Sequence, residues 1–141
     1  MIIAVDFDGT IVENRYPEIG EEIPFATETI RMLISERNRI ILWTVREGKY
    51  LEDAVAWCRE RGIEFYAINK DYPEEKMENN KHFSRKIKAD MFIDDRNVGG
   101  LPEWGEIYRM IQKSYEDIIA ERHNTSFSEK SSKRKKHWWN L

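Results

Sequence analysis

Four short runs of consecutive apolar residues constrain the fold of this chain most strongly. Their apolar segments read IIAV, IILW, FYAI and MFI, and they lie within Ile2–Asp6, Arg39–Thr44, Phe65–Asn69 and Met91–Asp94. Each segment is continuously apolar rather than alternating, which is typical of strands that are covered on both faces. The runs therefore predict a mainly parallel sheet with helices packed against it.

Stretches with helical periodicity separate these runs. Apolar residues recur at helical spacing over residues 25–34 and again over residues 51–58. Gly62 follows the second stretch, at the place where a glycine commonly ends a helix. A longer amphipathic stretch over residues 107–123 predicts a last helix that ends near His123.

The alternation of strands and helices predicts an α/β fold, built as a three-layer, doubly wound sheet. The 141 residues are enough for one domain with its own core, which we expect over residues 1–123. Residues 124–141 carry five basic side chains against one acidic one and predict a flexible tail. Because Trp138 and Trp139 stand beside the basic residues, contact with nucleic acid or an anionic membrane surface is the alternative.

Composition narrows the class of protein. The net charge of −3 and the acidic body do not resemble a surface that binds nucleic acid over a whole domain. The single cysteine, Cys58, excludes an internal disulfide and fits a reducing, cytoplasmic setting. The N-terminus lacks a signal-peptide pattern, and no apolar run approaches the roughly 20 residues that span a bilayer. We therefore expect a cytoplasmic protein without a membrane span.

Polar residues follow the predicted strands. In an open α/β sheet, ligands bind beyond the carboxyl ends of the strands, and the residues at those ends are Asp6, Asp8, Thr44, Asn69, Asp94 and Asp95. Several carboxylates that converge repel one another unless a cation lies among them. Oxygen ligands of this kind favour Mg²⁺, which usually also binds a substrate phosphate. Asp6 could then attack the phosphorus atom, and Asp8 could protonate the leaving oxygen.

Four segments resemble the motifs of the haloacid dehalogenase (HAD) superfamily phosphohydrolases. DFDGT is similar to the first motif, DxDG(T/S), and ILWTVR is similar to the second, an apolar strand that ends in Thr or Ser. KIKADMFIDDR resembles the third and fourth motifs, a lysine followed by a strand that ends in paired aspartates. The segments occur in the order of the family and span residues 2–96.

The resemblance implies a phosphomonoesterase, a hydrolase that acts through an aspartyl-phosphate. Asp6 would be the nucleophile, and Asp8 would protonate the leaving group and then activate water. Thr44 would hydrogen-bond the phosphoryl oxygens. Lys86 would stabilise the negative charge, although Lys88 also precedes the last strand and the choice between the two lysines stays open.

The resemblance also implies the metal ligands. Asp6, the backbone carbonyl of Asp8 and Asp94 would hold Mg²⁺, and Asp95 would support them. No insertion is long enough for the cap domain of larger relatives, so the chain resembles a capless member with a Rossmann-like core and an open site. We expect a phosphorylated small molecule as the substrate.

Residues 9–24, 46–50 and 69–84 are expected to form the rim of this site. Arg46 and Asn69 are candidates for contact with the substrate beyond its phosphate, and a structural or solvated role is the alternative for each. A neighbouring subunit could cover the mouth, so a homo-oligomer is a further expectation.

Two other functions stay open. The chain could be a binding module that holds phosphorylated ligands with little or no turnover. It could also be a phosphatase of nucleic-acid ends or phosphoproteins, because an open site admits bulky substrates and the basic tail could assist their binding.

Overall fold

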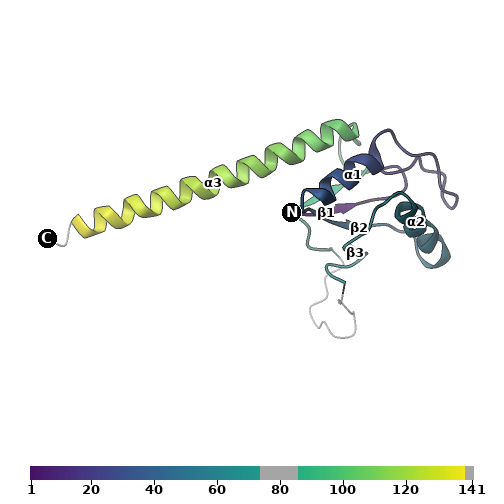
Figure 1. Ribbon diagram of the computed structural model, residues 1–141, viewed down its shortest axis with the longest axis horizontal. Helices are drawn as coiled ribbons and strands as arrows, with labels where there is room; N and C mark the ends of the chain where they lie inside the picture. Colours follow the sequence, from purple (N-terminus) through teal and green to yellow (C-terminus); the bar gives the residue numbers. More distant parts are fainter. Residues whose placement is uncertain (74–85, 139–141) are drawn as a thin grey trace. The chain divides into compact units, whose positions relative to one another are not determined.

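The computed structural model describes the backbone of residues 1–73 and 86–138, and the side chains of residues 1–73 and 86–124. The chain divides into two compact units, Met1–Gly105 and Glu106–Leu141. The first unit contains the whole sheet and two helices (Figure 1). The residues predicted to form the site lie in this unit.

The sheet has four parallel strands in the order β3-β2-β1-β4. The strands are β1 Ile2–Val5, β2 Arg39–Leu42, β3 Ala67–Ile68 and β4 Met91–Ile93. β1 is central and pairs with β2 on one side and with β4 on the other, so the predicted α/β fold with a parallel sheet is confirmed.

The continuous apolar runs supply the core, as their pattern predicts. Ile3, Ala4 and Val5 of β1 are each at most 1% exposed, and Ile40–Leu42 of β2 are equally buried. β4 is less covered, because Phe92 remains 36% exposed. The central strands are therefore the best-protected part of the sheet, and the site is built where they end.

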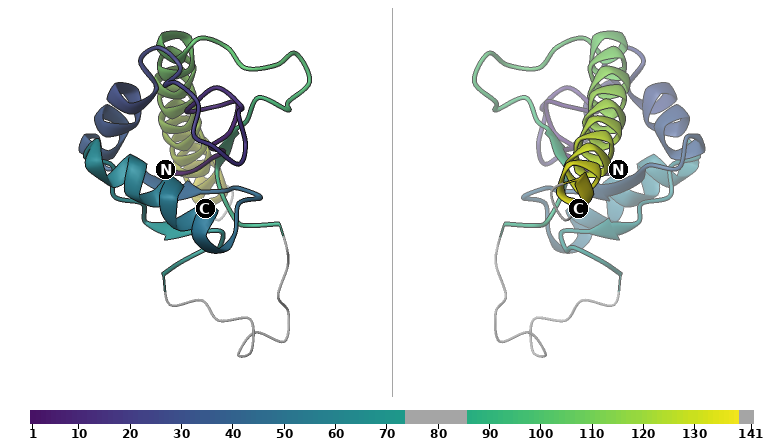
Figure 2. Two further views of the ribbon diagram at one scale, coloured as in Figure 1. Left: turned by 90° about the vertical axis from the view of Figure 1, so that its right-hand side faces the viewer. Right: turned by 90° about the vertical axis from the view of Figure 1, so that its left-hand side faces the viewer.

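The helices of the first unit lie side by side, α1 over Ala26–Ser35 and α2 over Gly48–Glu60 (Figures 1 and 2). The Arg31 side chain of α1 donates a 2.6 Å hydrogen bond to the Arg61 carbonyl at the end of α2. Gly62 follows with a φ of 79°, which confirms it as the glycine that ends this helix. Both helices occur where the periodicity predicts them.

The start of α1 is fixed by a carboxylate from the preceding loop. Glu22 accepts a 2.8 Å hydrogen bond from the Thr27 backbone N–H and another from the Thr27 hydroxyl. The first N–H groups of a helix have no partner within the helix, so Glu22 supplies one and also places a negative charge at the positive end of the helix.

The strands end earlier than the apolar runs suggest. β3 covers only Ala67–Ile68 of the predicted Phe65–Asn69. It ends before Asn69, because Asn69 adopts a left-handed conformation with a φ of 54° that does not fit a strand. Thr44 and Asp94 likewise lie just beyond β2 and β4. The predicted polar ends are therefore loop residues held by the sheet.

The last helix, α3, covers Trp104–Trp138 and does not end near His123. The sequence contains no glycine or proline between Glu106 and Trp138, so no strong helix breaker follows the predicted end. Residues 124–138 are thus helical, and the predicted helix end near His123 is wrong.

Other expectations for the tail are not tested. The side chains of its basic residues and of Trp138, as well as all of Trp139, lie outside the described part of the structure. The division into a domain of residues 1–123 and a tail of residues 124–141 stays a prediction. Among the helices of the described residues, none combines the length and apolar character that a bilayer span requires.

The buried thiol of Cys58 tests the packing of α2. Its side chain is fully buried, and burial raises the pKa of the thiol to about 12. We predict that a thiol-specific disulfide reagent modifies Cys58 at least about 100-fold more slowly in native protein than in denaturant, because the thiolate is the reactive form. Fast labelling of the native protein would contradict the observed packing.

Candidate functional site at the ends of β1 and β4

The site lies where the strand order reverses. From β1 the chain moves through β2 to β3 and then returns to the other side of β1 for β4, which leaves a crevice between the carboxyl ends of β1 and β4. Val5 and Ile93 are paired in register, so the next residues, Asp6 and Asp94, emerge together. The Asp6 backbone N–H donates a 3.0 Å hydrogen bond to the Ile93 carbonyl and fixes this alignment.

Three carboxylates converge in this crevice. Asp6, Asp94 and Asp95 each place one oxygen within 4.8 Å of the others. Ligands on opposite sides of an octahedral Mg²⁺ ion are about 4.2 Å apart, so small side-chain rotations would bring all three oxygens onto one ion. The donor set consists only of carboxylate oxygens, which is the chemistry that Mg²⁺ prefers. These residues therefore fit the predicted metal.

The electrostatics of Asp6 agree with a site for a cation. The pKa of Asp6 is raised to about 7, mainly by burial. The Asp94 and Asp95 carboxylates contribute to the rise, and a hydrogen bond from the Phe7 backbone opposes it. Without a cation the protein thus resists ionisation of Asp6 near neutral pH. A dication between the carboxylates would reverse that effect.

The turn after β1 positions Asp95. The Thr10 hydroxyl accepts a 3.0 Å hydrogen bond from the Asp95 backbone N–H and donates one of 3.3 Å to its carboxylate. The Thr10 carbonyl in turn accepts a 3.0 Å hydrogen bond from the buried Trp104 indole. Gly9 has a φ of 83°, and a methyl group on it would overlap the Asp95 carboxylate. Thr10 was not predicted as a positioning residue, although it stands in the DFDGT segment.

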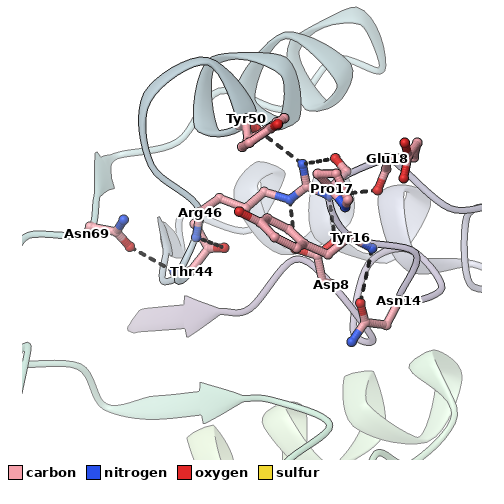
Figure 3. A network of polar contacts seen from close by, with 9 residues as sticks. All are labelled: Asp8, Asn14, Tyr16, Pro17, Glu18, Thr44, Arg46, Tyr50 and Asn69. Carbon is pink, nitrogen blue, oxygen red and sulfur yellow. Dashed lines mark hydrogen bonds and ion pairs between the residues drawn. The ribbon is translucent and has the colours of Figure 1, made fainter.

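Asp8 forms a two-pronged ion pair with Arg46 (Figure 3). The Nε and Nη2 atoms of Arg46 each donate a 2.7 Å hydrogen bond to a different oxygen of Asp8. The Arg46 side chain is fully buried, whereas that of Asp8 retains 10% exposure. Arg46 therefore holds both oxygens of Asp8 from the protein side.

Every guanidinium N–H of Arg46 has an acceptor within the protein. Besides Asp8, the acceptors are the backbone carbonyls of Pro17, Glu18 and Tyr50, at 2.9 to 3.3 Å. The interaction with Asp8 raises the pKa of Arg46. In this conformation the side chain offers no donor to a substrate, so the geometry does not support the predicted substrate contact.

Thr44 and Asn69 meet at the ends of β2 and β3 (Figure 3). The Asn69 side-chain oxygen accepts a 2.8 Å hydrogen bond from the Thr44 backbone N–H, and the Thr44 hydroxyl accepts one of 3.1 Å from the Arg46 backbone N–H. Asn69 thus braces Thr44, and its contact with a substrate stays a prediction.

A pocket of about 580 Å³ opens over these residues, and it is lined by Asp6, Asp8, Asn14, Tyr16, Trp43, Thr44, Val45, Asp94 and Arg96. It joins four of the predicted site residues, Asp6, Asp8, Thr44 and Asp94. Asn14 and Tyr16 belong to the predicted rim, but Trp43, Val45 and Arg96 were not predicted. The sequence could have indicated these three residues, because each lies next to Thr44 or the paired aspartates.

The lysine of the third motif is not brought into the pocket. The Lys86 ammonium lies 6.0 Å from the centre of the Phe92 ring, and Lys86 and Lys88 are both exposed. Neither lines the pocket, and the Lys88 backbone N–H donates to the Asp71 carboxylate. The catalytic role of Lys86, and the choice between it and Lys88, stay predictions.

The fold and site together define an α/β protein with an acidic crevice at the point where the order of its parallel strands reverses. A solved structure of a conserved protein from Bacteroides thetaiotaomicron is 65% identical and has a TM-score of 0.76. The similarity covers 84% of this chain and 96% of that one. The chain therefore belongs to the family of that conserved protein. No protein-family model and no curated protein matches the sequence.

The contact between Gly9 and Asp95 generates a first prediction for the site. We expect Gly9→Ala to lower the free energy of unfolding by about 2–4 kcal/mol, because alanine is strained at this φ and its methyl group would displace the Asp95 carboxylate. Gly105→Ala is the matched control, since nothing lies within 4 Å of its added methyl group. Equal stability of the two variants in urea unfolding would contradict the close approach.

The raised pKa of Asp6 generates a second prediction. An unfolded Asp6 ionises near pH 3.8, whereas the folded one ionises near pH 7 without metal, so the folded state binds the extra proton between these values. Wild-type protein in EDTA should thus lose stability relative to Asp6→Asn as the pH rises from about 4 to about 7. Urea unfolding across this range measures the difference, and parallel curves for the two proteins would refute it.

Proposed function

We propose that this protein is a Mg²⁺-dependent phosphomonoesterase of the HAD type, with a three-layer, doubly wound core and no cap domain. One observation carries the proposal: Asp6, Asp94 and Asp95 converge at the switch point of the sheet, and Asp8 faces the same pocket. The sequence motifs already associate these residues with phosphoryl transfer. The chain thus combines the motifs with a crevice that can hold a phosphate.

The acidic cluster supports the choice of metal and of nucleophile. Mg²⁺ bound by Asp6 and Asp94, with the Asp8 backbone carbonyl and Asp95 in support, would neutralise charge on the phosphate and orient it. Asp6 has two carboxylate oxygens, so one can bind the cation while the other faces the phosphorus. Its position at the end of β1 fixes the carboxylate before a substrate arrives.

In the first half-reaction, a carboxylate oxygen of Asp6 forms a bond to phosphorus as the bond to the ester oxygen breaks. Asp8 transfers a proton to that oxygen, which leaves as an alcohol. In the second, Asp8 accepts a proton from water as the water oxygen attacks phosphorus. The bond to Asp6 breaks, inorganic phosphate leaves and the Asp6 carboxylate is restored.

The remaining pocket residues have simpler roles in this proposal. Thr44 contacts the phosphoryl oxygens, because it lines the pocket at the end of β2. Arg96 is a basic residue that lines the pocket, so it can supply positive charge there. Lys86 would have to move from its place near Phe92 to contribute.

The test is phosphate release from 4-nitrophenyl phosphate by the full-length protein. We expect turnover with Mg²⁺ and none in EDTA, and we expect Asp6→Asn to reduce kcat by at least about 1,000-fold, because it removes the nucleophile. Asp117→Asn is the matched control, since this exposed residue of α3 lies outside the pocket and should leave kcat unchanged.

Undiminished turnover by Asp6→Asn would exclude the aspartyl-phosphate. Absence of turnover by the wild type over a broad panel of phosphate esters, together with measurable binding of Mg²⁺ and phosphate, would favour the binding module instead. Measurements of turnover and of ligand binding on one protein thus distinguish a phosphatase from a binding module.

A further inference from the structure

We infer that Arg46 is a positioning residue, which acts through Asp8 and does not contact the substrate. This inference rests on the proposed function, because it assigns Asp8 its part in the reaction. Three facts about Arg46 carry it: complete burial, the use of every guanidinium N–H, and the way in which its bonds are divided between Asp8 and the backbone.

The bonds to the backbone fix the guanidinium itself. Its Nη1 donates to the Pro17 carbonyl at 3.0 Å and to the Tyr50 carbonyl at 3.3 Å, and its Nη2 donates to the Glu18 carbonyl at 2.9 Å. Pro17 and Glu18 belong to the loop before α1, and Tyr50 lies in the first turn of α2. Arg46 thus joins two separate segments, and each holds it in place.

Aromatic rings complete the enclosure. The guanidinium carbon lies 5.1 Å from the centres of the Phe7 and Tyr16 rings, within the range of a cation–π contact. Phe7 is itself fully buried. A planar cation that is held by three carbonyls and two rings has little freedom to rotate.

The two remaining bonds transfer this rigidity to Asp8 (Figure 3). Parallel bonds of 2.7 Å to both oxygens fix the plane of the carboxylate as well as its position. Asp8 precedes Gly9 in the turn after β1. A single hydrogen bond to Asp8 would leave its carboxylate free to rotate. A group that moves a proton must be held close to its productive geometry, so the guanidinium supplies what the turn alone lacks.

Lysine cannot replace this geometry. It would keep the positive charge, but its ammonium group cannot span both oxygens of Asp8 in one plane. Arg46→Lys therefore separates orientation from charge, and Arg46→Gln removes both. Arg59→Gln is the matched control, because Arg59 is an exposed residue of α2 outside the pocket.

The experiment is a double-mutant cycle on the full-length protein with 4-nitrophenyl phosphate and Mg²⁺. We expect Arg46→Lys and Arg46→Gln to lower kcat at least tenfold while KM changes less than threefold. Asp8→Asn should lower kcat by about 100-fold or more. In the Asp8→Asn background the Arg46 substitutions should lower kcat less than threefold, because the acid–base group that Arg46 positions is absent.

Other outcomes would overturn the inference. Equal losses in the two backgrounds would mean that Arg46 acts independently of Asp8, and a large rise in KM at constant kcat would make it a substrate ligand. Circular dichroism and thermal unfolding check each variant, and failure of both Arg46 variants to fold would assign the residue to stability instead. A wild type that needs no Mg²⁺, or an active Asp6→Asn, would refute the proposed function. These results differ from those that would refute the role of Arg46, so the two failures can be told apart.

Discussion

The parallel pairing of β1 with β4 is the constraint on which the site depends. Val5 and Ile93 are in register, so the chain leaves both strands at the same level and delivers Asp6 and Asp94 to one crevice. Shifting the register by one residue would send alternate side chains to the opposite face of the sheet and separate the two carboxylates. The buried apolar residues of β1 stabilise the backbone that brings these like charges together.

Much of the fold follows from local patterns. The continuous apolar runs predicted buried parallel strands, and Ile3–Val5 and Ile40–Leu42 are nearly inaccessible in the structure because both faces of the central strands are covered. The polar residues at their ends were predicted to meet because parallel strands share an edge, and Asp6, Asp8, Thr44 and Asp94 do line one pocket. Local patterns could not establish that β1 and β4 are neighbours, which is a property of the whole topology.

The parts that sequence could not supply depend on contacts between distant segments. The sequence left Arg46 open between a substrate contact and a structural role. Its partners include carbonyls from a loop about thirty residues earlier, and no local pattern encodes them. Lys86 matched a motif by spacing, yet spacing does not determine where a long side chain points. The end of α3 was misjudged for a different reason. The apolar stripe behind the prediction ended before His123, whereas the absence of helix breakers allowed the helix to continue.

The alternation of side chains around Thr44 has a consequence for how relatives of this protein can diverge. Thr44 and Arg46 are anchored on either side of Val45, which is 83% exposed at the mouth of the pocket. A replacement at this valine would alter the surface that meets an incoming molecule without disturbing the buried guanidinium or the sheet. If the proposed function holds, single substitutions there would change which molecules fit the pocket while the residues assigned to the reaction stay the same.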